Sequence, residues 1–298
     1  MQVHSANALF AEEGLPLKAT PAPVQRVPFS SRPQEAADAI NAWCSRETQG
    51  LVPRIVGEAD ISPDTRLTIV NALYLKEKWL KPFDADATEE QGRFTRADGT
   101  TLRLPLMHRV ADFLYAEGED WQAVALFYRP NEGYRQGRDE PGCFIGILPK
   151  GDARAFAQGL TPERYDAIRR ALVTGGLQEV SVMLPRMDID SGACSLRAPL
   201  AAMGLGSLFT TEADFSGFAD ERLFLSDVLQ RCRVLVEEEG TEAAAVTAMP
   251  SVVLSLDVEK PEPKRIHFTR PFIWAIGDLG TAAPPYFLGL CEEPAEGK

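Results

Sequence analysis

Residues Thr65 to Asp84 read TRLTIVNALYLKEKWLKPFD. From Thr65 to Leu75 the residues are β-branched or apolar at both alternating sets of positions, a pattern typical of a strand covered on both faces. From Lys76 to Phe83 this pattern is lost, and the segment has the character of a turn and a short extended piece. The stretch therefore predicts a central strand of a sheet, followed by a turn.

The segments before this strand predict an edge strand and a helix. Three prolines between Ala19 and Pro28 exclude a helix interior, so we expect loop and edge strand there. The run from Ser31 to Gly50 places Ala36, Ile40 and Trp43 on one helical face, with a serine at its start and a glycine as its stop signal. This is the best helix pattern in the chain.

The segments after the central strand predict mainly further strands. Asp98-Gly99 marks a hairpin, and the apolar segments 121–128 and 142–148 are expected to pair. The remaining expected strands are 180–189, 223–236, 271–276 and 286–290, and the expected helices are 153–173 and 195–203. We find no internal repeat and no low-complexity linker, so one mixed α+β domain over residues 1–298 is the economical interpretation.

Composition and charge exclude several classes of partner. The net charge of −12, without a cluster of Lys and Arg, argues against nucleic-acid binding. No apolar run approaches the length of a membrane-spanning helix. The five cysteines lack CxxC spacing, so neither a zinc site nor a disulfide framework is indicated, and unpaired thiols are expected.

The sequence offers no motif for catalysis or for a cofactor. Its three histidines, His4, His108 and His267, are not placed beside a nucleophile in a known motif, and we expect them at the surface or at sheet edges. No phosphate-binding, dinucleotide-binding or metalloprotease motif follows any strand. The sequence therefore predicts no catalytic residue, no metal and no cofactor.

A second stretch, Val234 to Phe272, reads VLVEEEGTEAAAVTAMPSVVLSLDVEKPEPKRIHFTRPF. It begins as a strand, passes an acidic Gly-Thr segment and a run of small residues, and returns through prolines and charges. Small residues in an exposed segment often mean only flexibility. A merely flexible loop, however, gives no reason for Gly240-Thr241-Glu242 to precede the alanines.

Four motifs in order resemble the serpin family of serine-protease inhibitors. NALYLKEKWLKPFD is similar to the family's most recognisable strand and turn, and EEGTEAAAVTA resembles the hinge of its inhibitory members. DFSG (214–217) and RPF (270–272) match a family loop and the strand after the reactive loop. The resemblance covers nearly the whole chain and implies a large mixed β-sheet, further antiparallel sheets, surrounding helices and an exposed reactive loop at about 237–262.

The resemblance implies a suicide-substrate inhibitor that is not itself an enzyme and acts as a monomer. A protease cleaves the exposed loop, which then inserts as a new strand of the large sheet and distorts the bound protease. The family's usual loop length places the scissile bond between Leu254 and Ser255, with Met249-Pro250 as a neighbouring alternative. The apolar bait before Ser255 favours chymotrypsin-, elastase- or subtilisin-like proteases and disfavours trypsin-like ones.

Other site residues follow from the resemblance, one position at a time. The hinge comprises Glu238, Glu239, Gly240, Thr241, Glu242, Ala243, Ala244 and Ala245. Four residues are expected to accompany opening of the sheet, with Asn71 as a polar residue behind the loop, Trp79 at the loop's entry point, Arg186 as the charge partner of Glu238, and Gln230 in place of a family histidine.

The sequence also departs from the family pattern. The family's first helices and the strand beneath the main sheet have no counterpart before Met1, so the domain is expected to be N-terminally incomplete, and Lys18 to Pro28 is too short for the helix usually found there. Pro250 has no N–H for a new ladder. A non-inhibitory or truncated relative that is merely cleaved therefore stays open as an alternative. The resemblance favours an extracellular or periplasmic location, although the chain shows no signal peptide.

Overall fold

The computed structural model describes residues 3–18, 24–130, 142–240, 262–280 and 283–294. Contacts among these residues divide the chain into two compact units. Unit 1 contains Lys76–Asp188 and the described residues from Leu235 onward, and unit 2 contains Val3–Leu75 and Ile189–Val234. The expectation of one domain over residues 1–298 stays a prediction.

Unit 2 is built on a mixed sheet with the strand order β10-β11-β3-β1-β2. A sixth strand, β9, also pairs with β11. Its strands are β1 (Val3–Glu12), β2 (Val24–Val27), β3 (Leu67–Leu75), β9 (Met187–Asp190), β10 (Cys194–Ser195) and β11 (Asp227–Val236). β3 lies between β11 and β1, which confirms the predicted central strand. β2 lies at the edge, as the prolines around it predict.

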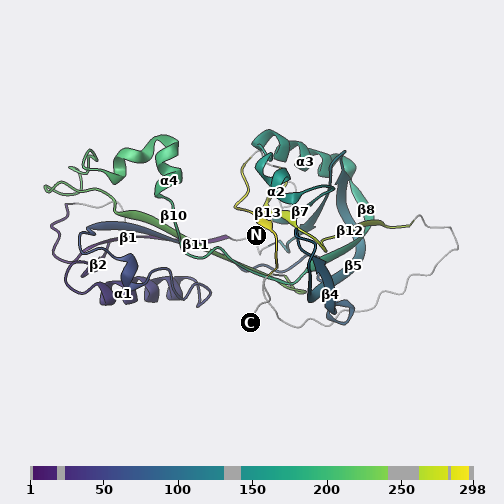
Figure 1. Ribbon diagram of the computed structural model, residues 1–298, viewed down its shortest axis with the longest axis horizontal. Coiled ribbons are helices and arrows are strands. Elements are labelled where there is room, and N and C mark those ends of the chain that lie inside the picture. Colours follow the sequence, from purple (N-terminus) through teal and green to yellow (C-terminus); the bar gives the residue numbers. More distant parts are fainter. Residues whose placement is uncertain (1–2, 19–23, 131–141, 241–261, 281–282, 295–298) are drawn as a thin grey trace. The chain divides into compact units, whose positions relative to one another are not determined.

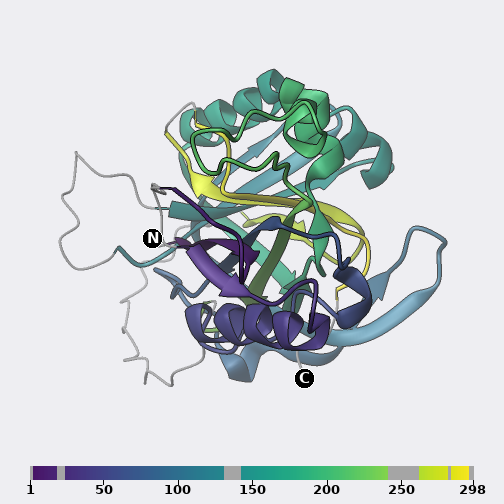
Figure 2. The same cartoon turned by 90° about the vertical axis from the view of Figure 1, so that its left-hand side faces the viewer.

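The two faces of this sheet pack against different helices. α1 (Pro33–Glu47) covers one face, where Ile40 and Trp43 meet Phe10 and Val70. α4 (Arg197–Leu200) and the turns after it lie on the other face, which a second cluster including Leu67 fills. The ribbon shows the two helices on opposite sides of these strands (Figure 1), and the view turned by 90° shows α1 beside the purple strand β1 (Figure 2).

The ends of α1 differ from the sequence prediction. The helix begins at Pro33 with Arg32 as its N-cap, and no side chain caps it, although a serine start at Ser31 was expected. Proline is well tolerated here because the first helical N–H groups have no partner within the helix. The apolar face was predicted correctly, since Ala36, Ile40 and Trp43 are all buried.

Unit 1 is built on a second sheet with the strand order β12-β8-β5-β6-β7-β13-β14. An eighth strand, β4, also pairs with β5. Its strands are β4 (Glu89–Thr95), β5 (Thr101–Glu117), β6 (Trp121–Phe127), β7 (Gly142–Pro149), β8 (Leu177–Pro185), β12 (Lys264–His267), β13 (Phe272–Asp278) and β14 (Phe287–Cys291). All pairs are antiparallel except β12 with β8. The predicted Asp98-Gly99 hairpin and the β6–β7 pair are both present.

Two helices cover one face of this sheet: α2 (Ala153–Gln158) and α3 (Pro162–Gly175). They lie side by side above the strands in Figure 1. Phe156, Tyr165 and Leu172 of these helices pack in a cluster with apolar residues of β6, β7 and β13. The hydroxyl of Thr161 accepts a hydrogen bond from the N–H of Arg164 at 3.3 Å and so caps the start of α3.

Two strand predictions need correction. The segment 180–189 was expected to be one strand, but Arg186 separates β8 from β9. The charged return after the reactive loop was not expected to form a strand, yet its residues 264–267 form β12. A strand this short, preceded by prolines and lysine, carries no alternating pattern that the sequence could show.

None of the five cysteines forms a disulfide bond. Cys44, Cys143 and Cys291 are buried, and burial raises the pKa of Cys44 and of Cys291 to about 12. Such thiols stay protonated at neutral pH and act as small apolar side chains.

Candidate functional site

The hinge begins with a tight turn directly after β11. Its two ends are Glu237 and Gly240, whose backbone groups bond to each other. The N–H of Glu237 donates to the carbonyl of Gly240 at 2.7 Å, and the N–H of Gly240 donates to the carbonyl of Glu237 at 3.2 Å. The chain therefore leaves the direction of β11 at this point.

The segment after β3 holds this turn in place. The N–H of Trp79 donates to the carbonyl of Glu239 at 2.9 Å, and the N–H of Phe83 donates to the carbonyl of Glu238 at 2.8 Å. The indole Nε1 of Trp79 donates to the carbonyl of Glu237 at 2.8 Å. Three consecutive hinge carbonyls are thus bound by residues of the motif that follows the central strand.

Gly240 occupies a position that fits only glycine. Its φ of +143° lies in a region that residues with a Cβ rarely adopt. A Cβ on Gly240 would lie 2.2 Å from the carbonyl oxygen of Glu77 and 2.5 Å from Cα of Lys78. Both contacts are with backbone, so the turn could not accommodate them without moving.

Glu238 and Arg186 form the charge pair that the resemblance implies. Nη2 of Arg186 lies 2.5 Å from Oε1 of Glu238, and its Nε lies 3.2 Å from Oε2. The hydroxyl of Thr88 also donates to Oε1 at 2.8 Å, and the carboxylate of Glu90 lies 3.5 Å from Arg186. The sequence did not single out Thr88 or Glu90.

The environment of Glu238 keeps its carboxylate ionised. Burial raises its pKa, but hydrogen bonds from Arg186 and Thr88 outweigh burial, so the net pKa lies below the ordinary value. The Glu238 side chain is only 12% exposed and that of Arg186 31% exposed. The pair is therefore shielded from water, unlike a typical surface salt bridge.

Trp79 is a buried anchor. It is 1% exposed and stacks on Tyr128 with ring centroids 4.7 Å apart. Phe83 and Phe144 meet it edge-on. Because the ring is fixed on three sides, its Nε1–H is held toward the carbonyl of Glu237.

Asn71 and Gln230 link two neighbouring strands of unit 2. They are register partners on β3 and β11, and Nε2 of Gln230 donates to Oδ1 of Asn71 at 2.9 Å. Nδ2 of Asn71 in turn donates to Oδ1 of Asn7 on β1 at 2.6 Å. The sequence did not single out Asn7, although a polar residue within an apolar strand was a usable signal.

The two strands that Gln230 and Asn71 link are paired directly with each other. β3 and β11 run parallel, with register pairs from Asp227↔Thr68 to Val234↔Leu75. Since their partners are adjacent, no other strand lies between them.

Several predicted site residues lie outside the described residues: Thr241, Glu242, Ala243, Ala244, Ala245, Pro250, Leu254 and Ser255. The hinge is described up to Gly240.

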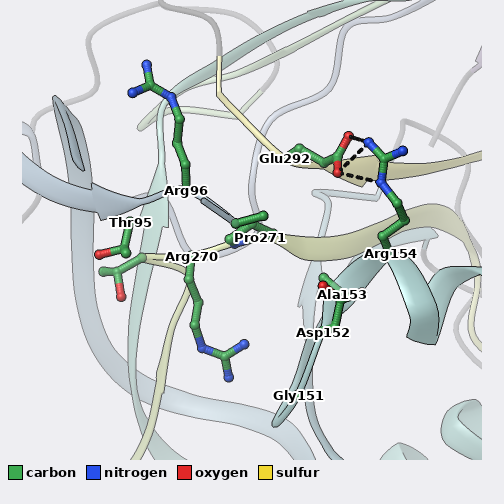
Figure 3. A pocket seen from close by; sticks show the side chains of 11 residues that line it. Thr95, Arg96, Gly151, Asp152, Ala153, Arg154, Arg270, Pro271 and Glu292 are labelled. Atoms are coloured by element: carbon green, nitrogen blue, oxygen red, sulfur yellow. Dashed lines mark hydrogen bonds and ion pairs between the residues drawn. The ribbon is translucent and has the colours of Figure 1, made fainter. Parts of the chain in front are cut away.

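A cavity of about 410 Å³ in unit 1 lies beside the RPF motif. Arg154 and Glu292 pair across its rim, with Nη2 of Arg154 2.7 Å from the carboxylate. Figure 3 shows the guanidinium groups of Arg96 and Arg270 pointing in different directions. The arginines do not converge on one point, so the cavity lacks the geometry of an anion site.

The described ranges contain neither a metal-binding cluster nor a helix suited to span a membrane. Within them, no group of three or more His, Cys, Asp or Glu side chains is arranged to hold a metal ion. The helices of this part of the chain include none that is long and apolar enough to cross a membrane.

Comparison with known proteins identifies the family. The profile of the family described as "Serpin (serine protease inhibitor)" matches residues 1–294. The chain belongs to the serpin family. The α+β fold expected from the resemblance is confirmed, because this serpin superposes on thyroxine-binding globulin, solved in complex with thyroxine, with a TM-score of 0.80 at 24% identity, over 99% of this chain and 76% of that one.

Two curated serpins illustrate the range of relatives. An uncharacterized serpin-like protein of Thermococcus kodakarensis is 32% identical over 99% of this chain, and the leukocyte elastase inhibitor of Sus scrofa is 32% identical over 90%. The chain spans 67% and 69%, respectively, of the length of these proteins, about two thirds. Members of the family are in general protease inhibitors and not enzymes.

Proposed function

We propose that this serpin inhibits serine proteases as a suicide substrate. A protease cleaves the reactive loop, at about 237–262, between Leu254 and Ser255, and the freed segment inserts between β3 and β11. Distortion of the bound protease then leaves the covalent acyl-enzyme trapped. The serpin acts as a monomer, and its partner is the target protease. The chain itself carries out no catalysis.

The observation that carries this proposal is the direct parallel pairing of β3 with β11 next to the hinge turn. β11 runs into the turn Glu237–Gly240, which sends the chain back on itself. A strand formed after Gly240 would therefore run antiparallel to β11 and also to β3. Insertion would replace one parallel ladder by two antiparallel ladders, which are slightly more stable per residue.

The side chains of the inserting segment suit this exchange. Alternation assigns Thr241, Ala243, Ala245, Thr247, Met249, Ser251 and Val253 to one face, and most of these residues are small. Each new ladder bond contributes on the order of 1 kcal/mol net. A dozen such bonds would supply roughly 10 kcal/mol, comparable to the stability of a whole domain.

In this proposal, insertion would break several of the described contacts. The Gln230–Asn71 hydrogen bond joins the two strands that have to separate. Trp79 binds the carbonyls of Glu237 and Glu239, and Arg186 pairs with Glu238, so these contacts would oppose insertion of the hinge. Together these contacts would keep the uncleaved loop in its expelled position.

The target class follows from the bait. Val252, Val253 and Leu254 are apolar, which suits a protease with an apolar specificity pocket of the chymotrypsin, elastase or subtilisin type. Cleavage at Met249-Pro250 is the alternative, although proline after the scissile bond usually makes a poor substrate.

A second candidate function is that of a serpin cleaved without trapping. Pro250 favours it, because proline has no N–H for the new ladder and lies within the inserting segment. Insertion that stops there would leave the acyl bond free to hydrolyse.

The purified chain incubated with chymotrypsin, and separately with elastase, distinguishes the two functions. On a denaturing gel, a band at the combined mass of serpin and protease is expected for trapping. If the gel shows a clipped serpin product and no covalent band, the inhibitory proposal is wrong and the substrate alternative is supported. Mass spectrometry of the released C-terminal peptide locates the cleaved bond.

A hinge variant tests the insertion step. Thr241→Arg places a charge at the first inserted position, so we expect cleavage at the wild-type rate but no covalent band. The matched control Thr241→Ser keeps a small hydroxyl side chain and should still trap. Trapping by Thr241→Arg would show that loop insertion is not the mechanism.

A further inference from the structure

Two of the three histidines of the chain meet around one buried serine in unit 1. Nε2 of His108 lies 3.0 Å from Oγ of Ser181, and Nε2 of His267 lies 3.2 Å from the same oxygen. Ser181 is 7% exposed, and the two imidazole rings are 6.4 Å apart. The expectation of a surface or sheet-edge position is confirmed for His267, which lies on the edge strand β12, but not for His108, which is half-buried on β5. We call the two histidines and Ser181 the histidine bridge.

The histidine bridge crosses three neighbouring strands. His108 on β5 and His267 on β12 are both register partners of Met183 on β8, and Ser181 lies two residues before Met183. Residues two apart on a strand share a face, so all three bridging side chains lie on one face of the sheet. The bridge therefore ties the edge strand β12 through β8 to the more central β5.

The hydrogen-bonding capacity of the Ser181 hydroxyl decides which protonation states of the two imidazole rings leave every group with a partner. A serine hydroxyl donates one hydrogen bond and accepts two. With neutral rings, Ser181 donates to one Nε2 and accepts from the other; with one ring protonated, the same pattern holds. With both rings protonated, both Nε2 atoms donate, the hydroxyl proton loses its acceptor, and two positive charges face each other across one oxygen. The second proton is therefore the costly one.

Burial and the positive charge on Arg265 add to this cost, whereas two carboxylates on the same face act in the opposite sense. Arg265 of β12 is the register partner of Ser181 and lies on the same face. Glu179 of β8 and Asp112 of β5 oppose each other one repeat further along that face. The pKa of His267 is lowered first by burial and then by positive charge on His108 and Arg265.

β12 has few other attachments. It comprises only Lys264–His267, and among the described strands it pairs with β8 alone. Outside that ladder, Lys264 pairs with Glu117 at 3.1 Å, and Nε2 of Gln122 donates to the carbonyl of Arg265 at 3.3 Å. It is also the first strand described after residue 261, so it anchors the C-terminal side of the reactive loop segment.

We propose that the histidine bridge is an acid-sensitive latch that holds β12 on the sheet at neutral pH and loosens it when both rings are protonated. The inference rests on the geometry of unit 1 and does not depend on the inhibitory proposal. The sign follows from the lowered pKa of His267. Its contribution to stability is complete above the unfolded value of about 6.5 and is lost as the pH falls through the folded value.

Hydrogen exchange measured by mass spectrometry at about pH 7.5 and about pH 5, corrected for intrinsic rates, tests the latch. We expect the backbone of 264–267 to lose roughly tenfold in protection at the lower pH, while β3 keeps its protection. His267→Gln and His108→Gln each leave at most one titrating ring and should abolish this loss. His4→Gln, which changes the histidine of unit 2, is the matched control and should respond as the wild type does.

Nuclear magnetic resonance titration of the histidine side chains gives a second, independent test. If the rings are coupled, His108→Gln raises the pKa of His267, whereas His4→Gln leaves it unchanged. Unchanged protection of β12 in the wild type between the two pH values, or an equal loss in both bridge variants and the wild type, would overturn the proposal. So would a pKa of His267 that does not respond to removal of His108.

Discussion

The conformation of the hinge turn depends on the absence of a Cβ at Gly240. The φ of +143° and the 2.2 Å approach of a Cβ to the carbonyl of Glu77 both require glycine. The close approach is what lets Trp79 bind the neighbouring hinge carbonyl. A substitution here acts on the attachment of the turn and not on the sheet itself.

Gly240→Ala should therefore destabilise the chain by about 1–3 kcal/mol, the usual cost of a strained backbone position. The free energy of unfolding in urea measures this cost. Gly14→Ala is the control, because a Cβ there meets nothing within 4 Å and its φ is not in the left-handed region. A loss no larger than that of Gly14→Ala would contradict the assigned role of Gly240.

At the residue scale, the family resemblance pointed to Arg186 and Glu238 but not to the residues that bind them. Arg186 and Glu238 are 52 positions apart in the sequence, and only the resemblance linked them. Thr88 and Ser181 have no sequence signal, because their roles depend on which residues the strand register places opposite them. Neither composition nor spacing contains that register.

At the scale of elements, β3 and β11 form the part of unit 2 that opening would disrupt. Their side-chain link, from Gln230 to Asn71, is one hydrogen bond within a ladder of backbone bonds. Asn71 keeps a second partner, Asn7, when Gln230 is removed. The link is therefore an addition to the ladder and not a requirement for folding.

A double-mutant cycle of Gln230→Ala with Asn71→Ala should give a coupling free energy of about 0.5–1.5 kcal/mol, the net value of a hydrogen bond. Unfolding in urea of the wild type, both single variants and the double variant supplies the four free energies. Gln230→Ala combined with Ser195→Ala is the comparison pair, since Ser195 bonds to Asp227 instead. Coupling within error of zero for Gln230 and Asn71 would mean that the link contributes nothing to strand cohesion.

Long elements with a strong pattern could be predicted, and short ones could not. α1 and β3 carry enough apolar positions for their period to be clear. β12 has four residues and a single fully buried one, Ile266, so nothing distinguishes it from a charged loop. It forms a strand because β8 offers an edge at the right place, which is a tertiary cause.

At the scale of the whole molecule, insertion of the cleaved loop would replace one parallel ladder by two antiparallel ladders. This replacement predicts a change in thermal stability. Cleavage of the loop with insertion would add the hydrogen bonds of an extra strand to unit 2. Cleavage without insertion would add none. The melting temperature of the cleaved chain therefore reports on insertion without reference to any trapped protease.

We expect limited proteolysis near Leu254 to raise the melting temperature by about 10–20 °C, as a gain of several kcal/mol implies for a chain of this size. Differential scanning calorimetry of intact and cleaved protein measures the shift. Cleaved Thr241→Arg should melt close to the intact protein. An unchanged melting temperature after complete cleavage of the wild type would favour the non-inhibitory alternative.

The direct β3–β11 ladder also bears on how long the protein remains in one form. If the inserted state is the more stable one, the uninserted state persists only because eight register pairs must separate before any new bond forms. Its persistence is then a half-life and not an equilibrium population. Strand separation has a large activation enthalpy, so this half-life shortens steeply on warming. A preparation stored warm would lose inhibitory capacity while remaining folded, and its age would matter as much as its concentration.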